Sequence, residues 1–327
     1  MEYAGRYRMF DFNSTHTYPI AERPNVLKLD GLVYPAEASG ASEAVHSETL
    51  DRVAEGVLQA RQAGRPVILF TGAHIIKLGF SPLVIDLMQR DIITLIATNG
   101  AGSIHDFELA LIGQTSESVP NALPEGLFGM ARETGEYLNG ALRAGNEERL
   151  GYGESVGRMI GTRWPAGTEF PHKQISILGR AYELGMPATV HATIGTDIID
   201  QHPSFDGCAK GGTSARDFGI FAHEVMGLGG GGVVLNIGSA VTGPEVLLKT
   251  VSMAANVGRP PNGLITANFD MRAADWACDI RPSQPGYYFR DMKSVVSRIP
   301  QAFDGHGYMV QGNFLDTVPA LHDLLTR

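Results

Sequence analysis

Apolar and polar residues follow one another along the chain first with the period of a helix and then with that of a buried strand. Between residues 47 and 63 apolar side chains recur every three or four positions, and Gly64 follows where a helix commonly ends. Residues 66–70 are then an almost unbroken apolar run, as in a strand that is buried on both faces. This stretch predicts a helix followed by a strand.

The same unit recurs further along the chain. Ser81 and Pro82 are typical of a helix start, so we predict a helix to residue 90 and a strand at 92–97. Three more helices are predicted at 174–184, 213–226 and 244–257, each followed by a strand, at 187–192, 232–236 and 264–268. Helices of this length alternating with short strands favour βαβ units. We therefore predict an α/β fold around a mostly parallel sheet that is covered on both faces.

Two stretches lack this regular pattern. Residues 1–44 contain scattered prolines and no sustained period, so we predict an irregular N-terminal arm that wraps the domain or a partner subunit. Residues 113–171 are rich in glycine and poor in periodicity, and we predict an insertion or interface region there instead of a separate domain. Residues 45–327 then form one α/β domain that carries this insertion.

Composition and charge narrow the choice of partners. The 327 residues carry 26 basic and 35 acidic side chains, a net charge of -9, and no basic stripe, so we expect no nucleic-acid partner. No apolar run reaches the ~18 residues that span a bilayer, and the first residues do not resemble a signal peptide. We therefore expect a cytoplasmic protein without a membrane partner. Glycine is abundant, at 40 of 327 residues, which predicts many tight turns and close backbone approaches.

Small and polar residues follow every predicted strand. In an open parallel sheet ligands bind at the carboxyl ends of the strands, because loops and helix N-termini meet there. The candidate ligand-binding residues at these ends are Thr71, Gly72, His74, Asn99, Gly100, Ala101, Gly102, Asp106, Asn236, Gly238, Ser239, Thr266 and Ala267. Residues 238–243 lie between a strand and a helix, which favours contact with a ribose or phosphate. Residues 227–232 contain G-x-G-x-x-G but precede a strand, so a turn is favoured there.

Acid–base groups lie in the same loops. His105 and His202 are candidate proton carriers, whereas His191 falls within a predicted strand and is interpreted as a core residue. The histidines lack the close spacing of a metal centre, so we predict no metal, although a metal-dependent lyase stays open as a further possibility. Asp106 and Asp197 would either hold a cation or a ribose, or cap a helix.

Several of these loops occur in the order found in one known family. The likeness is carried by residues 70–74 with Gly79 and Phe80, residues 98–102 with Asp106, residues 194–197, the triple glycine at 230–232, and the pair Thr266 and Ala267. Over residues 67–270 the chain resembles the deoxyhypusine synthase family. The resemblance implies a Rossmann-like, doubly wound fold that binds NAD, a homotetramer, and transfer of an aminobutyl group from spermidine to a protein lysine.

The chain departs from the family pattern where a polyamine would be recognised. Ile104 and His105 stand where the family has two glutamates, and Leu235 and Asn236 where it has a lysine and a histidine. The family's aspartate that faces the amine substrate corresponds to Asp197. Its catalytic lysine, which forms an imine, has one candidate counterpart, Lys293. An ordinary solvated helix start is the other interpretation of residues 290–293.

We therefore predict an NAD-dependent enzyme, a transferase or an oxidoreductase, that acts on a small amine or polar substrate and not on a polyphosphate. The substrate would be oxidised transiently and then transferred, eliminated or reduced, with Lys293, His105, His202 and Asp197 as catalytic residues. Two alternatives remain. One is a non-catalytic nucleotide-binding or sensing protein of the same fold. The other is a true deoxyhypusine or homospermidine synthase-type aminobutyl transferase. A homo-oligomer, a tetramer by resemblance, is expected.

Overall fold

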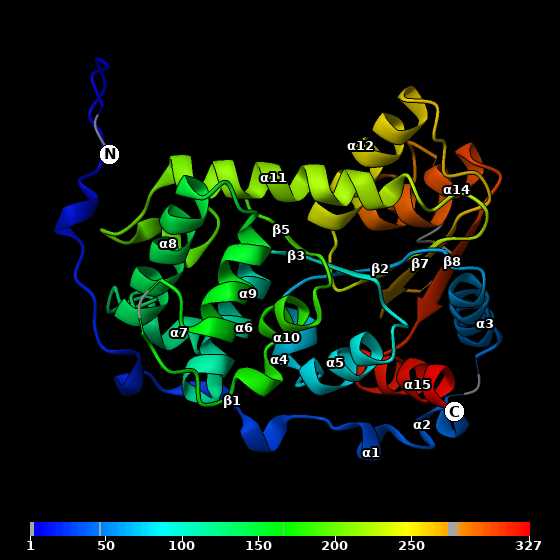
Figure 1. Cartoon of the computed structure of the whole chain (residues 1–327), viewed down its shortest axis with the longest axis horizontal. Coiled ribbons are helices and arrows are strands. Elements are labelled where there is room, and N and C mark those ends of the chain that lie inside the picture. The colour runs from blue at the N-terminus through cyan, green and yellow to red at the C-terminus, as the bar shows by residue number, and fades with distance from the viewer. Residues whose placement is uncertain (1–2, 46, 166, 274–278, 280) are drawn as a thin grey trace.

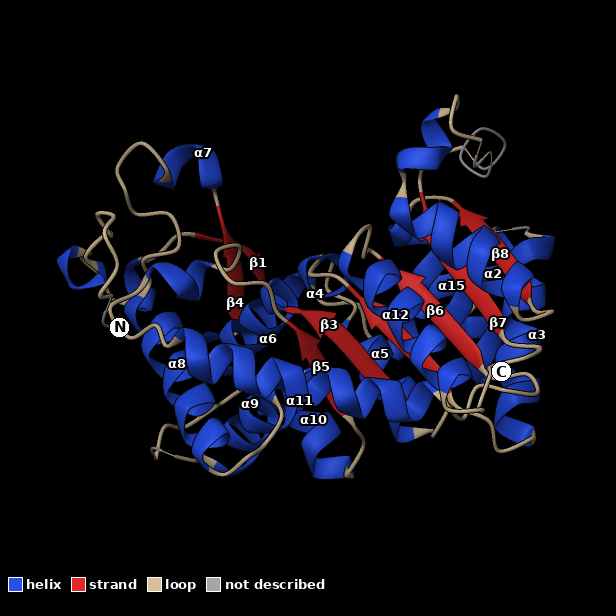
Figure 2. Cartoon of the chain, turned by 90° about the horizontal axis from the view of Figure 1, so that it is seen from above, coloured by secondary structure: helices blue, strands red, loops and turns tan. Residues whose placement is uncertain are grey.

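Six parallel strands form the central sheet of the computed structural model, which describes residues 3–45, 47–165, 167–273, 279 and 281–327. Their order across the sheet is β5-β3-β2-β6-β7-β8 (Figures 1 and 2). The strands are β2 (Val67–Thr71), β3 (Leu95–Asn99), β5 (Ala188–His191), β6 (Val233–Ile237), β7 (Ile265–Asp270) and β8 (His306–Gln311). The chain therefore enters the sheet in its middle, builds outward to β5, returns to the other side of β2 and continues to β8. This is the doubly wound Rossmann order, so the predicted fold class is confirmed.

Helices cover both faces of this sheet because the strands bury side chains on both sides. Along β2, Val67 and Leu69 pack toward one face, while Ile68 and Phe70 pack toward the other. The first face carries α3 (Glu48–Gln62), α5 (Ser81–Gln89) and α15 (Phe314–Thr326). The second carries α11 (Gly207–Val225), α12 (Thr242–Asn256), the π-helix η7 (Met292–Arg298) and α14 (Ile299–Ala302). The sheet is thus buried between two helical layers.

The predicted helices and strands agree with the structure apart from shifted ends, and the shifts have local causes. Ser47 caps α3 by accepting a hydrogen bond from the Leu50 amide (3.3 Å), as the pattern predicts. The strand predicted at 92–97 begins at Leu95, because the preceding amides close the end of α5 with hydrogen bonds to the Leu87 carbonyl. The helix predicted at 213–226 begins earlier, at Gly207, because Asp206 caps it there.

Residues 113–171 are largely helical, in contrast to the weak periodicity of their sequence. They contain β4 (Gln114–Glu117), α7 (Val119–Ala122), α8 (Arg132–Glu147) and α9 (Tyr152–Thr162). With α6 (Gly100–Ile112) and α10 (Ile177–Leu184), α8 and α9 enclose a second core beside β5. Glycines obscure the helical pattern because they mark close contacts. A Cβ at Gly153 of α9, for example, would lie 2.0 Å from the Ala188 carbonyl oxygen.

The N-terminal residues 3–44 run along the outside of the molecule, where they are drawn in blue in Figure 1. Their strand β1 (Asn25–Lys28) pairs antiparallel with β4, and Asp323 of α15 accepts hydrogen bonds from the Gly40 and Ser42 amides. The remaining elements of the structure are short: η1 (Phe12–Ser14), η2 (Ile20–Glu22), η3 (Leu29–Gly31), α1 (Pro35–Ala38), α2 (Ala41–Ala44), α4 (His74–Lys77), η4 (Lys173–Ile175), η5 (Ile198–Gln201) and η6 (Pro285–Tyr288). The arm is therefore held by β4 and by α15 of its own chain.

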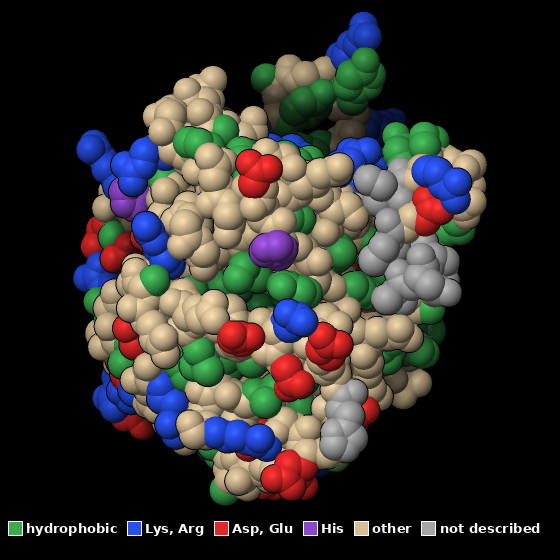
Figure 3. All heavy atoms as spheres, turned by 90° about the vertical axis from the view of Figure 1, so that its right-hand side faces the viewer, with side chains coloured by type: hydrophobic (Ala, Val, Ile, Leu, Met, Phe, Trp, Pro, Cys, Tyr) green, Lys and Arg blue, Asp and Glu red, His purple; other side chains and the backbone are tan. Residues whose placement is uncertain are grey.

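Acidic and basic side chains are interspersed on the face around α3 and β8, which Figure 3 shows. Within the described ranges, no helix combines the length and the apolarity that crossing a bilayer requires. Cys208 is an exposed free thiol on α11, whereas Cys278 lies outside the described residues.

Candidate functional site

The doubly wound order places a topological switch point between β2 and β6, the strands from which the sheet is built in opposite directions. The loops that follow them meet by their backbones. The Gly72 amide donates to the Ile237 carbonyl (3.2 Å), and a Cβ at Gly72 would lie 2.1 Å from the Gly238 carbonyl oxygen. His74 is exposed beside them, and Gly238 has a φ of +76°, which favours glycine. Ligands of doubly wound proteins bind in the crevice at such a point.

Five of the predicted cofactor-binding residues are buried beneath this crevice. Asn236 donates from Nδ2 to the Ser239 carbonyl (2.8 Å) and to Asn268 Oδ1 (2.7 Å), and Ser239 Oγ accepts from the Gly243 amide (2.9 Å). The other three are Thr71, Thr266 and Ala267, which lie within strands; Thr266 Oγ1 donates to the Val295 carbonyl (2.5 Å). Asn236 and Ser239 therefore hold the loop after β6 in place from within.

The loop between β3 and α6 contains the predicted Gly100, Ala101 and Gly102. Asn99 caps α6 by accepting from the Gly102 amide (2.9 Å). A Cβ at Gly100 would lie 1.9 Å from Asp197 Oδ2, so the Asp197 carboxylate fills the space at the start of the helix. A carboxylate thus faces the positive end of the helix, where a negative charge is favoured.

Asp106, predicted either to contact a ligand or to cap a helix, caps α10. Its buried carboxylate accepts from Ser176 Oγ (2.6 Å), the Ile177 amide (2.7 Å) and the Leu178 amide (3.0 Å). Burial raises the pKa of Asp106 to about 6, although these hydrogen bonds act in the opposite direction. The residue therefore joins α6 to α10 and supports the fold.

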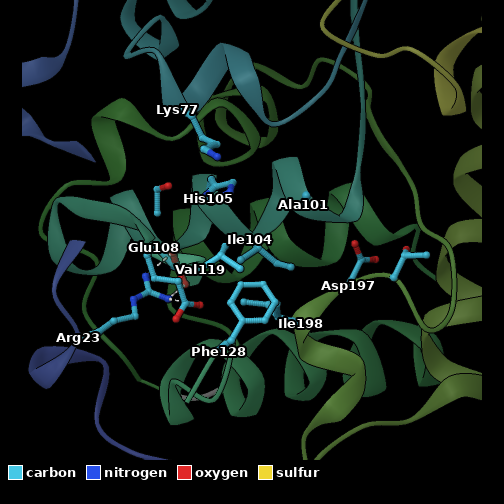
Figure 4. Close-up of a pocket in the computed structure, with 13 residues that line it drawn as sticks. Arg23, Lys77, Ala101, Ile104, His105, Glu108, Val119, Phe128, Asp197 and Ile198 are labelled. Atoms are coloured by element: carbon cyan, nitrogen blue, oxygen red, sulfur yellow. Dashed lines mark hydrogen bonds and ion pairs between the residues drawn. The ribbon is translucent and has the colours of Figure 1, made fainter. Parts of the chain in front are cut away.

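A cavity of about 220 Å³ lies between α6, the loop after β5 and the N-terminal arm (Figure 4). Its lining residues are Arg23, Lys77, Ala101, Ile104, His105, Glu108, Ser116, Glu117, Val119, Phe128, Thr196, Asp197 and Ile198. Lys77 belongs to α4, which directly follows β2, so the cavity adjoins the switch point. His74 lies between the two sites. A Cβ added at Gly238 would lie 3.5 Å from the Cβ of His74, and the charge of His74 contributes to lowering the pKa of His105.

His105, a predicted proton carrier, lines this cavity, and a hydrogen-bonded chain fixes its ring. Thr115 Oγ1 donates its single proton to Glu108 Oε2 (2.5 Å), so it accepts from His105 Nδ1 (2.7 Å). Nδ1 therefore carries the proton of the neutral imidazole, and Nε2 is left as the basic nitrogen. Burial lowers the pKa of His105 to about 4 against the attraction of the Glu108 carboxylate, so the ring is neutral at pH 7. A base oriented by a further group is a recurring catalytic arrangement.

Glu108, at the far end of this chain, is ionised because it is paired with Arg23 of the N-terminal arm. Arg23 donates to both carboxylate oxygens, at 2.9 and 2.6 Å, and Thr134 Oγ1 donates to Oε1 at 2.9 Å. Burial alone would raise the pKa of Glu108, but the charge and hydrogen bonds of Arg23 outweigh it and hold the pKa below its usual range. The chain from His105 thus ends in a buried ion pair.

Asp197, predicted to face the substrate, is held by a lysine that the sequence pattern does not single out. Lys210 of α11 donates to Asp197 Oδ2 (2.7 Å) and to both carboxylate oxygens of Asp200 (2.6 and 2.8 Å). The Lys210 side chain is only 1% exposed. Burial raises the pKa of Asp197, and the Lys210 charge acts in the opposite direction. Asp197 therefore brings a paired carboxylate to the cavity.

The other two predicted catalytic residues lie elsewhere. His202 is fully buried, and its Nε2 contacts the Gly129 carbonyl at 2.7 Å. Lys293 lies in η7, which packs on β7 and β8, with Nζ 4.2 Å from the centre of the Tyr287 ring. Lys293 and His105 are thus on opposite sides of the switch point, and the structure does not bring them together. Among the described residues, no group of three His, Cys, Asp or Glu side chains is placed to hold a metal ion.

The cavity also contains functional groups that sequence reasoning misses. One local signal exists for Glu108, which lies three residues after His105 and therefore on the same face of a helix. Arg23 and Thr115 give no such signal, because they come from the arm and the insertion, both of which lack periodicity. Lys77 and Lys210 lie on helices whose neighbours in space cannot be inferred from their own sequence.

Comparisons with known proteins find likenesses in structure. No protein-family model and no curated protein matches the chain. A ternary complex of AgrE with ornithine and NAD+ aligns at 12% identity and a TM-score of 0.47, covering 86% of this chain and 34% of AgrE. A candidate LOR/SDH protein from Methanococcus maripaludis S2 aligns at 15% identity and a TM-score of 0.48, covering 86% of this chain and 70% of the other.

A candidate deoxyhypusine synthase from Entamoeba histolytica is also among the similar structures. It aligns at 9% identity and a TM-score of 0.44, covering 80% of this chain and 74% of its own. The chain spans about a third of the length of AgrE.

Proposed function

We propose that this chain is an NAD-dependent enzyme that oxidises a small amine or other polar substrate transiently, and then transfers, eliminates or reduces the product. One observation carries the proposal: His105, Thr115 and Glu108 present a neutral imidazole to a cavity beside the switch point of a doubly wound sheet. A neutral, oriented histidine is the group most often used as a general base.

The switch point is where a doubly wound sheet binds a dinucleotide, and two glycines lie in its loops. Gly72 packs against the Gly238 carbonyl, and a Cβ at Gly238 would lie 3.5 Å from His74 Cβ and 3.6 Å from Phe314 Cε2. Ala73, His74, Gly238 and Ala240 would border the bound cofactor. When bound, NAD supplies the acceptor for the hydride that leaves the substrate carbon.

His105 Nε2 would accept the proton of the substrate amine or hydroxyl while the carbon is oxidised. Thr115 keeps the other ring nitrogen protonated, and the Glu108 carboxylate stabilises the positive charge that develops on the ring. Because the pKa of His105 is about 4, the imidazolium passes its proton on readily at neutral pH. Asp197, across the cavity, would face an amine on the substrate.

Replacing His105 by glutamine should lower turnover by about 10²-fold, because glutamine cannot accept the proton. Turnover is measured as NADH absorbance with spermidine, L-norvaline and 2-hydroxyvalerate. In the wild type, activity should be lost as the pH falls through about 4, where the ring of His105 becomes protonated. His306→Gln, which changes an exposed histidine on β8, is the control and should retain full activity. Equal activity of the two variants would rule out His105 as the base.

The proposed cofactor site can be tested by substituting two glycines that both have a positive φ, one at the site and one away from it. Gly238 (φ +76°) and Gly185 (φ +66°) both have room for a methyl group, but Gly185 ends α10, away from the crevice. Either change to alanine should cost about 1–2 kcal/mol of stability. Gly238→Ala should also raise the Kd for NAD about tenfold, equivalent to 1.4 kcal/mol, measured by isothermal titration calorimetry. If both variants bind NAD like the wild type, the dinucleotide does not lie in this crevice.

Other outcomes separate the alternatives. If NAD binds but none of the three compounds is turned over, a non-catalytic nucleotide-binding or sensing protein is favoured. If spermidine donates an aminobutyl group and Lys293→Ala abolishes the transfer, the synthase-type transferase is favoured. The homo-oligomer and the cytoplasmic location stay predictions.

A further inference from the structure

Lys77 stands out among the charged residues that line the cavity. Arg23 is paired with Glu108 and approached by Glu117, and Asp197 is paired with Lys210. Lys77, in contrast, has no carboxylate within ion-pair distance among the residues that the structure describes, and its ammonium group points toward His105 in Figure 4. The ammonium group lies close enough to lower the pKa of His105. Lys77 is an exposed residue, and it therefore offers the cavity a positive charge without an ion-pair partner on the side of His105.

Four of the larger residues that line the cavity are apolar, beside the polar Ser116 and Thr196. Ile104 and Phe128 form its centre in Figure 4, with Val119 and Ile198 next to them. A cavity of about 220 Å³ is at the small end of ligand pockets. Such a space suits a small ligand with a short aliphatic chain.

The acidic residues of the cavity disfavour an anionic group that carries more than one negative charge. Glu117 and Asp197 line the same cavity and would repel a phosphate dianion more strongly than a single carboxylate. A carboxylate next to Lys77 places the adjacent substrate carbon, and its amino or hydroxyl group, at His105. The aliphatic chain of the ligand would then pack against the apolar residues of the cavity.

We propose that the cavity binds a small 2-amino or 2-hydroxy acid with an aliphatic side chain, with its carboxylate on Lys77 and its amino or hydroxyl group at His105. The inference rests on the proposed function for the chemistry that follows binding. In that reaction His105 Nε2 would take the N–H or O–H proton, and a bound nicotinamide cofactor would supply the acceptor for the C2 hydride. The C2–N or C2–O bond becomes a double bond, giving an imino or 2-oxo acid.

Binding of matched probes without any cofactor tests this proposal. The probes are L-norvaline and 2-hydroxyvalerate, each compared with its carboxamide, in which the charge is removed and the shape is kept. The wild type should bind each acid at least about tenfold more tightly than its amide, the effect of one charge-assisted contact. Calorimetry or ligand-observed NMR measures the four affinities.

Lys77→Met should remove this preference, and Lys77→Arg should keep most of it, because the positive charge is retained. Lys173→Met, which changes a lysine paired with Glu183, is the control and should behave as the wild type. Equal affinity for acid and amide in the wild type, an unchanged preference in Lys77→Met, or no binding of any probe would each overturn the proposal. A failure of NAD binding would instead count against the proposed function, because no cofactor is present in these measurements.

Discussion

Glu108→Ala is expected to lose about 3–5 kcal/mol of stability, because it leaves the charge of Arg23 buried without its partner. The side chains of Arg23 and Glu108 are 2% and 1% exposed, and two hydrogen bonds join them. Glu117, at 3.9 Å from Arg23, is too distant to replace both of these bonds. The same substitution removes the acceptor of Thr115, so the ring of His105 is no longer held in one tautomer.

Urea unfolding of the variant and the wild type measures this effect. Glu48→Ala is the matched control, since Glu48 forms an ion pair with Arg52 on the exposed surface of α3. The control should change the free energy of unfolding by less than about 0.5 kcal/mol. If the two variants lose similar amounts, the Arg23–Glu108 pair does not hold the N-terminal arm to α6 in the way that the structure indicates.

This ion pair also shows why the fold could be predicted from the sequence better than the site. The sheet follows from local patterns: an apolar run such as 66–70 needs burial on both faces wherever it lies in the chain. Glu108 and Arg23 are 85 residues apart, and Arg23 belongs to a segment without periodicity. The local sequence pattern therefore does not predict that the N-terminal arm contacts α6.

The glycines that follow the strands also show that the sequence predicts the fold better than the site. Their positions predict close backbone approach, and the structure has it, but what approaches differs from case to case. At Gly72 the neighbour is the backbone of another loop, that of Gly238. At Gly100 the neighbour is the carboxylate of Asp197. The position of a glycine after a strand predicts that another group approaches the backbone closely, but it does not show which group this is.

Lys210→Met is expected to lose about 3–5 kcal/mol of stability at pH 7, and the loss should shrink as the pH is lowered to 4. Methionine fills much of the same volume but leaves Asp197 and Asp200 together without a cation. Burial already raises the pKa of Asp197 in the wild type, and removal of Lys210 takes away the charge that opposes this rise. The folded variant therefore binds more protons than the unfolded chain above the ordinary pKa of an aspartate. Its stability falls as the pH rises through the raised pKa.

The pH dependence distinguishes this account from a simple packing defect. Unfolding is measured at pH 4 and pH 7 for the variant, for the wild type and for Lys249→Met, whose lysine pairs with Glu245 on the exposed side of α12. The Lys249 control should stay within about 0.5 kcal/mol of the wild type at both values. An equal loss for Lys210→Met at pH 4 and pH 7 would mean that packing, and not the two carboxylates, is at fault. A loss that grows with pH would mean that Lys210 keeps Asp197 ionised at the edge of the cavity.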